Sequence, residues 1–330
     1  MATIDDTDEP DGPLNRWVQR AIEDPERVYR ALFYTAMIFF MVTTLFPFYW
    51  LLVLAVTPNS EIIGGGFIPE IELFGATVPF PLPVPQGFNP GAFVDVFREI
   101  PFHLYMLNSF ALAVTTTIIV LVVASLAGYV FGRLEFPGRA VLMLAILAIS
   151  YFPPAAFVVP LYDVFAGNAV NIPFTDVALF QSIELLNTPG SMVLPFSALF
   201  MPLSIFILTT FYGQIPDGLE DAARVEGTTR LGALFRVIMP LSAPGVATAA
   251  VLTFISVYNE YFFSSIMATS PQAGNWSPLV GGILSYQTQY TTSFNLMAAA
   301  SVVGVLPMLI LVVVAQERIV SGLTSGALKE

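Results

Sequence analysis

The chain has 330 residues, of which 56% are hydrophobic and only 11% are charged, and its mean hydropathy is +0.76. Because a soluble domain carries about a quarter charged residues, this composition excludes an ordinary soluble enzyme and indicates several membrane spans. The chain has no cysteine and one histidine, His103. Disulfides, zinc–thiolate sites, iron–sulfur clusters and multi-histidine metal sites are therefore excluded.

The single lysine, Lys329, also excludes a nucleotide-binding P-loop. That motif needs a Gly-Lys-Ser/Thr run at the start of a helix, whereas Lys329 follows Leu328. We therefore expect no ATP hydrolysis by this chain. We predict no catalytic residue, no metal site and no nucleic-acid partner.

Six apolar segments are long enough to cross a bilayer, for which a helix needs about 20 residues. They are Ala31–Val56, Leu104–Phe131, Ala140–Ala166, Ser191–Tyr212, Leu241–Thr269 and Phe294–Ala315. Pro153, Pro154 and Pro160 should kink or unwind the third segment, which a helix bundle tolerates. The sequence thus predicts an all-α polytopic membrane protein with six transmembrane helices within residues 31–320.

The cationic residues fall almost entirely on one side of these spans. That side holds eleven of the twelve, namely Arg16, Arg20, Arg27, Arg30, Arg133, Arg139, Arg224, Arg230, Arg236, Arg318 and Lys329. Only Arg98 lies on the other side. Since lysine and arginine concentrate in cytoplasmic segments, we predict a multi-pass protein of the cell (plasma or inner) membrane. Its acidic N-terminal tail, residues 1–30, and its C-terminal tail, residues 321–330, should both be cytoplasmic.

The connections predicted on the outer side have a different composition. The first, residues 57–101, contains eight prolines and the triplet Gly64-Gly65-Gly66, so we expect irregular chain with room for short strands. Residues 167–189 and 270–293 contain no cation. None of these connections has the pattern of a separate folded domain.

The cytoplasmic segment 213–240 is the most informative part of the sequence. Pro216 or Asp217 suits the start of a short helix, and Gly227 suits a left-handed residue that ends it. Thr228 or Thr229 can cap a second helix. The expected geometry is a short helix, a sharp turn and a second helix that leads into a membrane span.

The second helix should present one apolar stripe. Its members at i, i+3, i+4 and i+7 are Leu231, Leu234, Phe235 and Ile238. By pattern alone, this segment is equally compatible with a linker on the membrane surface and with a docking element for another protein.

The same stretch resembles the EAA loop of ABC importer permeases. The matching residues are Asp221-Ala222-Ala223, Glu226-Gly227 and Val237-Ile238-Met239-Pro240, with thirteen residues from Gly227 to Pro240 as that motif has. The chain departs from the pattern in four places. Asp221 replaces the leading glutamate, Glu226 replaces the usual aspartate, and Val237 and Met239 replace isoleucine and leucine.

Motifs along the rest of the chain resemble the carbohydrate-importer branch of that family. They are Asn108-Ser109-Phe110, Ala127-Gly128-Tyr129, Arg133 to Arg139, Pro153-Pro154, Pro160-Leu161-Tyr162, Leu186-Asn187-Thr188, Tyr258-Asn259-Glu260-Tyr261 and the ending Gly322 to Lys329. The ending is similar to that of maltose-type permeases. A stretch around 166–184 is an insertion relative to the usual pattern.

The resemblance implies a type I ABC importer permease fold and alternating access. It implies a second homologous permease, two ATPase subunits that bind ATP and Mg, an extracytoplasmic solute-binding protein, a surrounding lipid bilayer and a carbohydrate substrate. No cofactor is expected on this chain itself. The residues implied for ATPase docking are Glu220, Asp221, Ala222, Ala223, Glu226 and Gly227.

Four polar residues are candidates for the substrate path, namely Asn108, Tyr258, Asn259 and Glu260. Glu260 falls inside a predicted span, where an ionisable residue indicates a functional site. The competing interpretation is structural, because polar side chains also join helices by hydrogen bonds, and for Glu260 the structural interpretation is favoured.

Two other classes of protein compete with the importer permease. A secondary transporter driven by protons or ions would place several ionisable groups at the midplane and show inverted repeats. Here the predicted spans contain only two carboxylates, Glu260 and, near the end of the third segment, Asp163, and no internal repeat is evident. A membrane-embedded enzyme would need a catalytic constellation, and the predicted spans assemble none.

Overall fold

The structure is a computed structural model that describes residues 25–64, 70–73, 76–79, 84–85, 87–171 and 178–327. The chain divides into two compact units, one made of residues 1–53 and 68–84 and the other of residues 54–67 and 85–330. Most of the predicted acidic tail, residues 1–24, and the final residues 328–330 lie outside the described residues.

The first unit contains most of helix α2, Pro25–Val56, and a hairpin of β1, Glu70–Leu73, and β2, Ala76–Pro79. The strands are antiparallel, with Glu70 opposite Pro79. Large apolar side chains such as Phe33 and Phe40 are exposed along α2, as expected for a helix that faces lipid. The helix contains the predicted first span, and the hairpin confirms that the 57–101 connection holds short strands.

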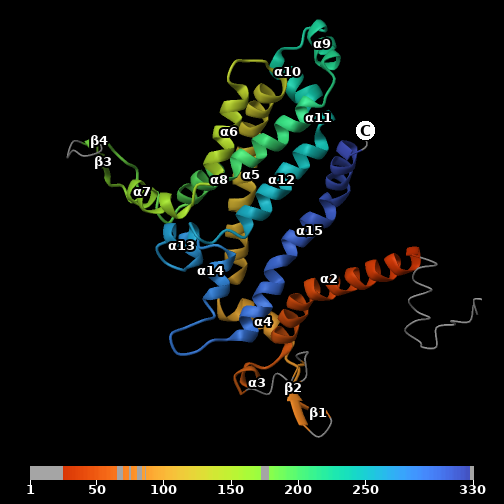
Figure 1. The fold of residues 1–330 in the computed structure, drawn as a ribbon. Helices are drawn as coiled ribbons and strands as arrows, with labels where there is room; N and C mark the ends of the chain where they lie inside the picture. Colours follow the sequence, from red (N-terminus) through yellow and green to blue (C-terminus); the bar gives the residue numbers. More distant parts are fainter. Residues whose placement is uncertain are drawn as a thin grey trace, which may run out of the picture. The chain divides into compact units, whose positions relative to one another are not determined.

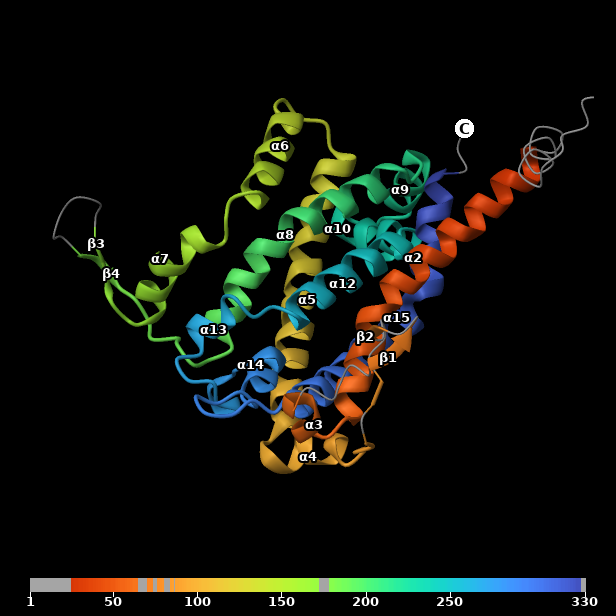
Figure 2. The same cartoon turned by 60° about the horizontal axis from the view of Figure 1, so that its bottom comes forward.

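The second unit is a bundle of long helices. Helices α5, Phe102–Arg133, α8, Gly190–Gly213, and α12, Ala243–Tyr258, pack side by side, and α15, Phe294–Ala327, packs on α12 (Figures 1 and 2). The close approach of α5 and α8 depends on Gly128, where an added Cβ would lie 2.9 Å from the Cβ of Leu208. Small residues let membrane helices approach closely in this way.

Four described helices are long and apolar enough to cross a membrane, within Val28–Val56, Phe102–Arg133, Gly190–Gly213 and Phe294–Gln316. Two bent helix pairs pass the same test, so the described residues hold four to six candidate spans. One pair is α6, Arg139–Ser150, with α7, Ala155–Phe165, which meet at 84°. Pro153 and Pro154 lie in the break between them, which confirms the predicted kink in the third segment.

The second bent pair corrects the predicted fifth span. A continuous segment made of α10, Arg230–Ala233, the π-helix η1, Leu234–Ile238, and α11, Met239–Leu241, meets α12 at 84°. The prediction ran from Leu241 to Thr269, whereas α12 ends at Tyr258 and a short helix α13, Ser264–Met267, follows. The reason is Glu260, whose carboxylate accepts hydrogen bonds from the backbone N–H groups of Phe263 at 2.8 Å and Ser264 at 3.3 Å. That capping starts a new turn in place of continued helix.

The connections hold more regular structure than the sequence predicted. The first connection contains helix α3, Asn59–Gly64, and helix α4, Ala92–Glu99. Helix α4 buries Ala92 and Val96. The prediction of irregular structure was therefore wrong for these residues. The connection after α13 contains η2, Ala273–Asn275, and helix α14, Leu279–Leu284.

The insertion around 166–184 holds a second hairpin. Strands β3, Ala169–Asn171, and β4, Ala178–Gln181, are antiparallel and extend from the end of α7 (Figure 1). The prediction of an all-α chain was therefore wrong in detail, since the chain is mostly helical but also contains two hairpins. The hairpins were missed because short strands within a connection can pair through their backbones without an alternating apolar pattern.

Candidate functional site

The segment predicted to dock another protein forms the expected pair of helices. Helix α9, Asp217–Val225, begins after Pro216 and is followed by Gly227 at φ 91°. Only a residue without a Cβ adopts that backbone freely, so Gly227 makes the sharp turn. The hydroxyl of Thr229 then accepts a hydrogen bond from the N–H of Gly232 at 3.1 Å and caps α10. The predicted helix, turn and cap are confirmed, and Figure 1 shows α9 at one end of the bundle.

A buried group of charges attaches α9 to the end of α5, and we call it the α5–α9 clamp. The carboxylate of Glu220 accepts hydrogen bonds from the hydroxyl of Tyr129 at 2.5 Å and from Nε of Arg133 at 3.0 Å. The Arg133 guanidinium also donates to the carbonyl of Ile215 at 2.5 Å and lies 2.9 Å from Oδ1 of Asp217.

Burial makes the clamp strong. The side chains of Arg133 and Glu220 are 4% and 10% exposed. Charge-assisted hydrogen bonds are the stronger class, and removal of one partner of a buried pair leaves an uncompensated charge. The first turn of α9 and the last turn of α5 are therefore fixed to each other.

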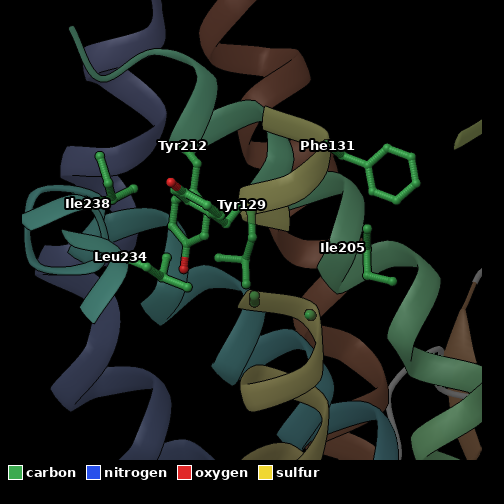
Figure 3. Close-up of a cluster of buried hydrophobic side chains, with 9 residues drawn as sticks. Tyr129, Phe131, Ile205, Tyr212, Leu234 and Ile238 are labelled. Carbon is green, nitrogen blue, oxygen red and sulfur yellow. The ribbon is translucent and has the colours of Figure 1, made fainter. Parts of the chain in front are cut away.

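An apolar cluster next to the clamp supports the second helix of the segment. Figure 3 shows Leu234 and Ile238 close to Tyr129 and Tyr212, in a group that joins α5, α8, η1 and α12. Tyr212 also donates to the hydroxyl of Ser125 at 3.2 Å. Segment 213–240 is thus packed on the bundle as well as clamped to it.

The apolar stripe predicted for this helix is only half correct. Leu234 and Ile238 are fully buried, but Leu231 and Phe235 are 57% and 46% exposed. The stripe assumed α-helical spacing, whereas residues 234–238 form a π-helix. Its wider turn rotates neighbouring side chains away from the α-helical face.

The outer face of α9 is free in the described part of the chain. Asp221, Ala222, Glu226 and Gly227 are exposed and Ala223 is half-buried. Val225 is 89% exposed although it is apolar.

Glu220 therefore differs from the other five residues that the resemblance implies for docking. It points into the chain and binds α5, while its neighbour Asp221 points outward and lies 3.8 Å from Arg224. Sequence reasoning did not place Tyr129 and Arg133 at this site, because they lie 91 and 87 residues away from Glu220. The sequence did contain one signal for this contact. Arg133 ends the second predicted span, and the first turn of α9 is acidic, so an ion pair between them could have been predicted.

The four candidates for a substrate path do not converge on one site. Tyr258 is buried and donates to the carbonyl of Gly304 at 2.8 Å. Asn108 donates to the carbonyls of Ala273 and Ser277 at 2.8 and 3.0 Å. These contacts are structural.

The remaining two candidates also have local partners. Asn259 donates to the carbonyl of Ile255 at 3.0 Å and contacts Sδ of Met308 at 3.3 Å. Glu260 lies beyond the end of α12 and caps the turn at Phe263, so it is not inside a helical span. Among the described residues, no group of histidine, aspartate and glutamate could hold a metal ion.

An apolar helical bundle with four to six candidate spans, and with a clamped helix exposed at one end, has the architecture of a polytopic membrane protein. Residues 124–324 match the family of binding-protein-dependent transport system inner membrane components. The chain belongs to this family. This membership confirms the resemblance to importer permeases and favours that class over a secondary transporter.

Similar proteins extend over nearly the whole chain. The sulfoquinovosyl glycerol transport system permease protein SmoH of Agrobacterium fabrum is 32% identical, over 88% of this chain and 90% of that protein. The trehalose transport system permease protein SugB of Mycobacterium tuberculosis is 31% identical, over 86% and 92%. The trehalose/maltose transport system permease protein MalG of Thermococcus litoralis is 29% identical, over 92% and 98%.

A solved structure shares the fold. The crystal structure of a bacterial ABC transporter involved in the import of the acidic polysaccharide alginate matches with a TM-score of 0.67 and 17% identity. The match covers 89% of this chain and 97% of that one. The bundle described above is therefore the fold of an ABC importer permease.

Proposed function

We propose that this chain is one transmembrane permease of an ATP-driven carbohydrate importer and is coupled to its ATPases through α9. The support for carbohydrate is that SmoH, SugB and MalG are named for sugars or sugar derivatives. The partners are a second homologous permease, two ATPase subunits that bind ATP and Mg, and an extracytoplasmic solute-binding protein. Related support comes from an alginate ABC transporter solved in complex with a periplasmic protein that holds an alginate pentasaccharide.

The proposed topology has six spans with both termini in the cytoplasm. Four spans are single helices, and the other two are the bent pairs α6 with α7 and α10–α11 with α12. The cations of Arg133, Arg139, Arg224 and Arg230 lie at the end of the bundle that carries α9. By the preference of cations for the cytoplasm, that end faces the ATPases.

The observation that carries the coupling proposal is the division of α9 into two faces. Its inner face is fixed to α5 by Glu220 and Arg133, and its outer face presents Asp221, Ala222 and Val225. A partner that grips the outer face must move α5 together with α9, because the buried ion pair joins them. Since α5 packs on α8 and α12, the displacement reaches the rest of the bundle, as alternating access requires.

The decisive experiment tests whether an ATPase subunit is captured through the outer face. The full chain is expressed with its native partners and purified in mild detergent, and ATPase recovery is measured. Ala222→Trp adds bulk on the exposed face and should abolish ATPase recovery, whereas the matched control Ala222→Ser should retain it. Equal recovery with both variants would contradict docking through α9.

A further inference from the structure

A cavity of about 530 Å³ lies between α5, α6 and α8, separate from the α5–α9 clamp. Most of its wall is apolar and includes Phe131, Phe136, Met143 and Phe206. The rings of Phe131 and Phe136 lie 5.8 Å apart at one side of it. This volume is within the range of about 300 to 1,000 Å³ that small-molecule sites have.

One wall of the cavity carries Arg139, a cation to which the described residues offer no counter-ion. Arg139 is the first residue of α6 and is half-buried, and within the described residues no carboxylate lies within ion-pair distance of it. The start of a helix carries partial positive charge, so an arginine there is unfavourable until an anion binds. Arg133, six residues earlier, shows the contrast because it is fully paired with Asp217 and Glu220.

The opposite wall carries Thr209, whose hydroxyl has no partner in the part of the chain that the structure describes. The Oγ1 atom of Thr209 is buried and forms no hydrogen bond with the described part of the chain. The neighbouring Thr210 satisfies its own hydroxyl by donating to the carbonyl of Phe206 at 3.0 Å. Four other hydroxyls in the described part of the chain are also buried without a partner, those of Thr116, Thr117, Ser197 and Ser242, so Thr209 adds polarity to this wall but does not by itself indicate a ligand.

The position of the cavity limits what can fill it. It lies where α5 ends at Arg133 and α6 begins at Arg139, so it is at the boundary between the apolar and polar parts of the chain. From Ala140 onward α6 is apolar and enters the predicted third span. An occupant must place an anion at this boundary and apolar groups deeper in the bilayer.

We propose that this cavity binds an anionic phospholipid. Its phosphate pairs with Arg139 and the start of α6, and part of one acyl chain lies against Met143 and Phe206. Basic pockets between membrane helices are known to select anionic head groups in this way. The inference needs only a chain that spans the membrane and does not depend on α9 docking.

Native mass spectrometry of the detergent-solubilised full chain, together with any subunits that copurify, tests the proposal. The probes are phosphatidylglycerol and phosphatidylcholine with identical acyl chains. One arginine contributes about fivefold in affinity for an anionic lipid. Phosphatidylglycerol should therefore bind about fivefold more tightly than phosphatidylcholine to the wild type, and Arg139→Gln should remove that preference.

Two further variants separate the site from general charge and from misfolding. Arg236→Gln removes an exposed arginine outside the cavity and should leave phosphatidylglycerol binding unchanged. Ala140→Phe fills the cavity while it keeps Arg139 and should lower phosphatidylglycerol binding as well.

Three outcomes would overturn the proposal. The first is equal binding of both lipids by the wild type, which is also expected if a protein partner covers the cavity. The second is unchanged phosphatidylglycerol binding in both Arg139→Gln and Ala140→Phe. The third is displacement of the lipid by excess inorganic phosphate, which would indicate a site for a small anion.

Discussion

The two ends of α5 are attached to their surroundings by different chemistry. At its N-terminal end, Tyr105 donates to the carbonyl of Pro271 at 2.8 Å and Asn108 donates to the carbonyl of Ala273 at 2.8 Å. At its C-terminal end, Arg133 and Glu220 form a buried ion pair. The first end holds a connection with neutral hydrogen bonds, and the second holds α9 with charges.

This difference shows which end of α5 is attached more strongly to its neighbouring segment. Neutral hydrogen bonds to backbone carbonyls contribute about 1 kcal/mol each. The bonds from Tyr105 and Asn108 to the connection after α13 can therefore break one at a time, each at a small cost. A buried pair behaves as a unit, because loss of one charge strands the other. In our proposal the C-terminal end of α5 receives force from a partner. This is the end held by the buried ion pair of Arg133 and Glu220, which is lost as a whole when either residue is removed.

The largest effect is expected from Gly227→Pro at the turn that follows α9. Proline cannot adopt φ 91°, so the turn and the presentation of α9 should be lost. Uptake of sugar into vesicles and stimulation of ATPase activity should fall to background while the chain remains in the membrane. Normal uptake by the variant would contradict the proposal that α9 couples transport to the ATPases.

A large loss of stability is expected from Glu220→Ala at the charged end of α5. The substitution leaves Arg133 buried without its main partner, which costs about 3 to 5 kcal/mol for a buried pair. Thermal unfolding in detergent measures it. The exposed neighbour provides the control, since Asp221→Asn should change stability by less than about 0.5 kcal/mol while it weakens ATPase recovery.

A smaller and local effect is expected from Asn108→Ala at the neutral end. The carbonyls of Ala273 and Ser277 lose their donor, at a cost of about 1 to 3 kcal/mol. Hydrogen exchange should become faster in residues 270–279 and stay unchanged in α9. Faster exchange in α9 would show that the two ends of α5 are not independent.

The smallest effect concerns Tyr286, which donates to the carbonyl of Val96 at 2.5 Å. Burial, and then the nearby Glu99, raise the pKa of the Tyr286 hydroxyl above its usual value. The folded state therefore favours the neutral phenol. The resulting stability is fully present below the unfolded pKa of about 10 and is lost only as the pH rises beyond it.

Comparison with Tyr286→Phe isolates this contribution. The variant should be less stable by about 1 kcal/mol. The stability gap between it and the wild type should stay constant up to about pH 9 and narrow as the pH rises above about 10, because the hydroxyl of the unfolded chain ionises there first. Thermal unfolding from about pH 6 to about pH 11 checks the prediction. A gap that stays constant above about pH 10 would contradict the raised pKa.

Local signals in the sequence predicted much of the fold. The long apolar runs predicted α2, α5, α8 and α15, because the length of a bilayer fixes the length of a spanning helix. Pro153 and Pro154 predicted the break between α6 and α7, and Gly227 and Thr229 predicted the turn and the cap within segment 213–240. Each of these depends on a residue and its immediate neighbours.

The errors came where a distant or unusual contact decides the local structure. Glu260 ends the fifth span because its carboxylate caps the next turn, and a hydropathy run cannot show that. The π-helix at Leu234 to Ile238 exposes Phe235, because packing against α5 and α8 selects the buried face. The insertion at 166–184 formed a hairpin through backbone pairing that has no apolar pattern.

The 11% of charged residues by themselves determined that this chain lies in a membrane, because so few charges cannot coat a soluble protein. The positions of those charges predicted which side of the membrane each connection faces. Only the tertiary structure decided what the charges do. It paired Arg133 with Glu220, left Asp221 outward and gave Arg139 no counter-ion among the described residues. Neighbouring carboxylates in one motif received opposite roles because consecutive residues of a helix point about 100° apart, so one meets the bundle and the other meets a partner.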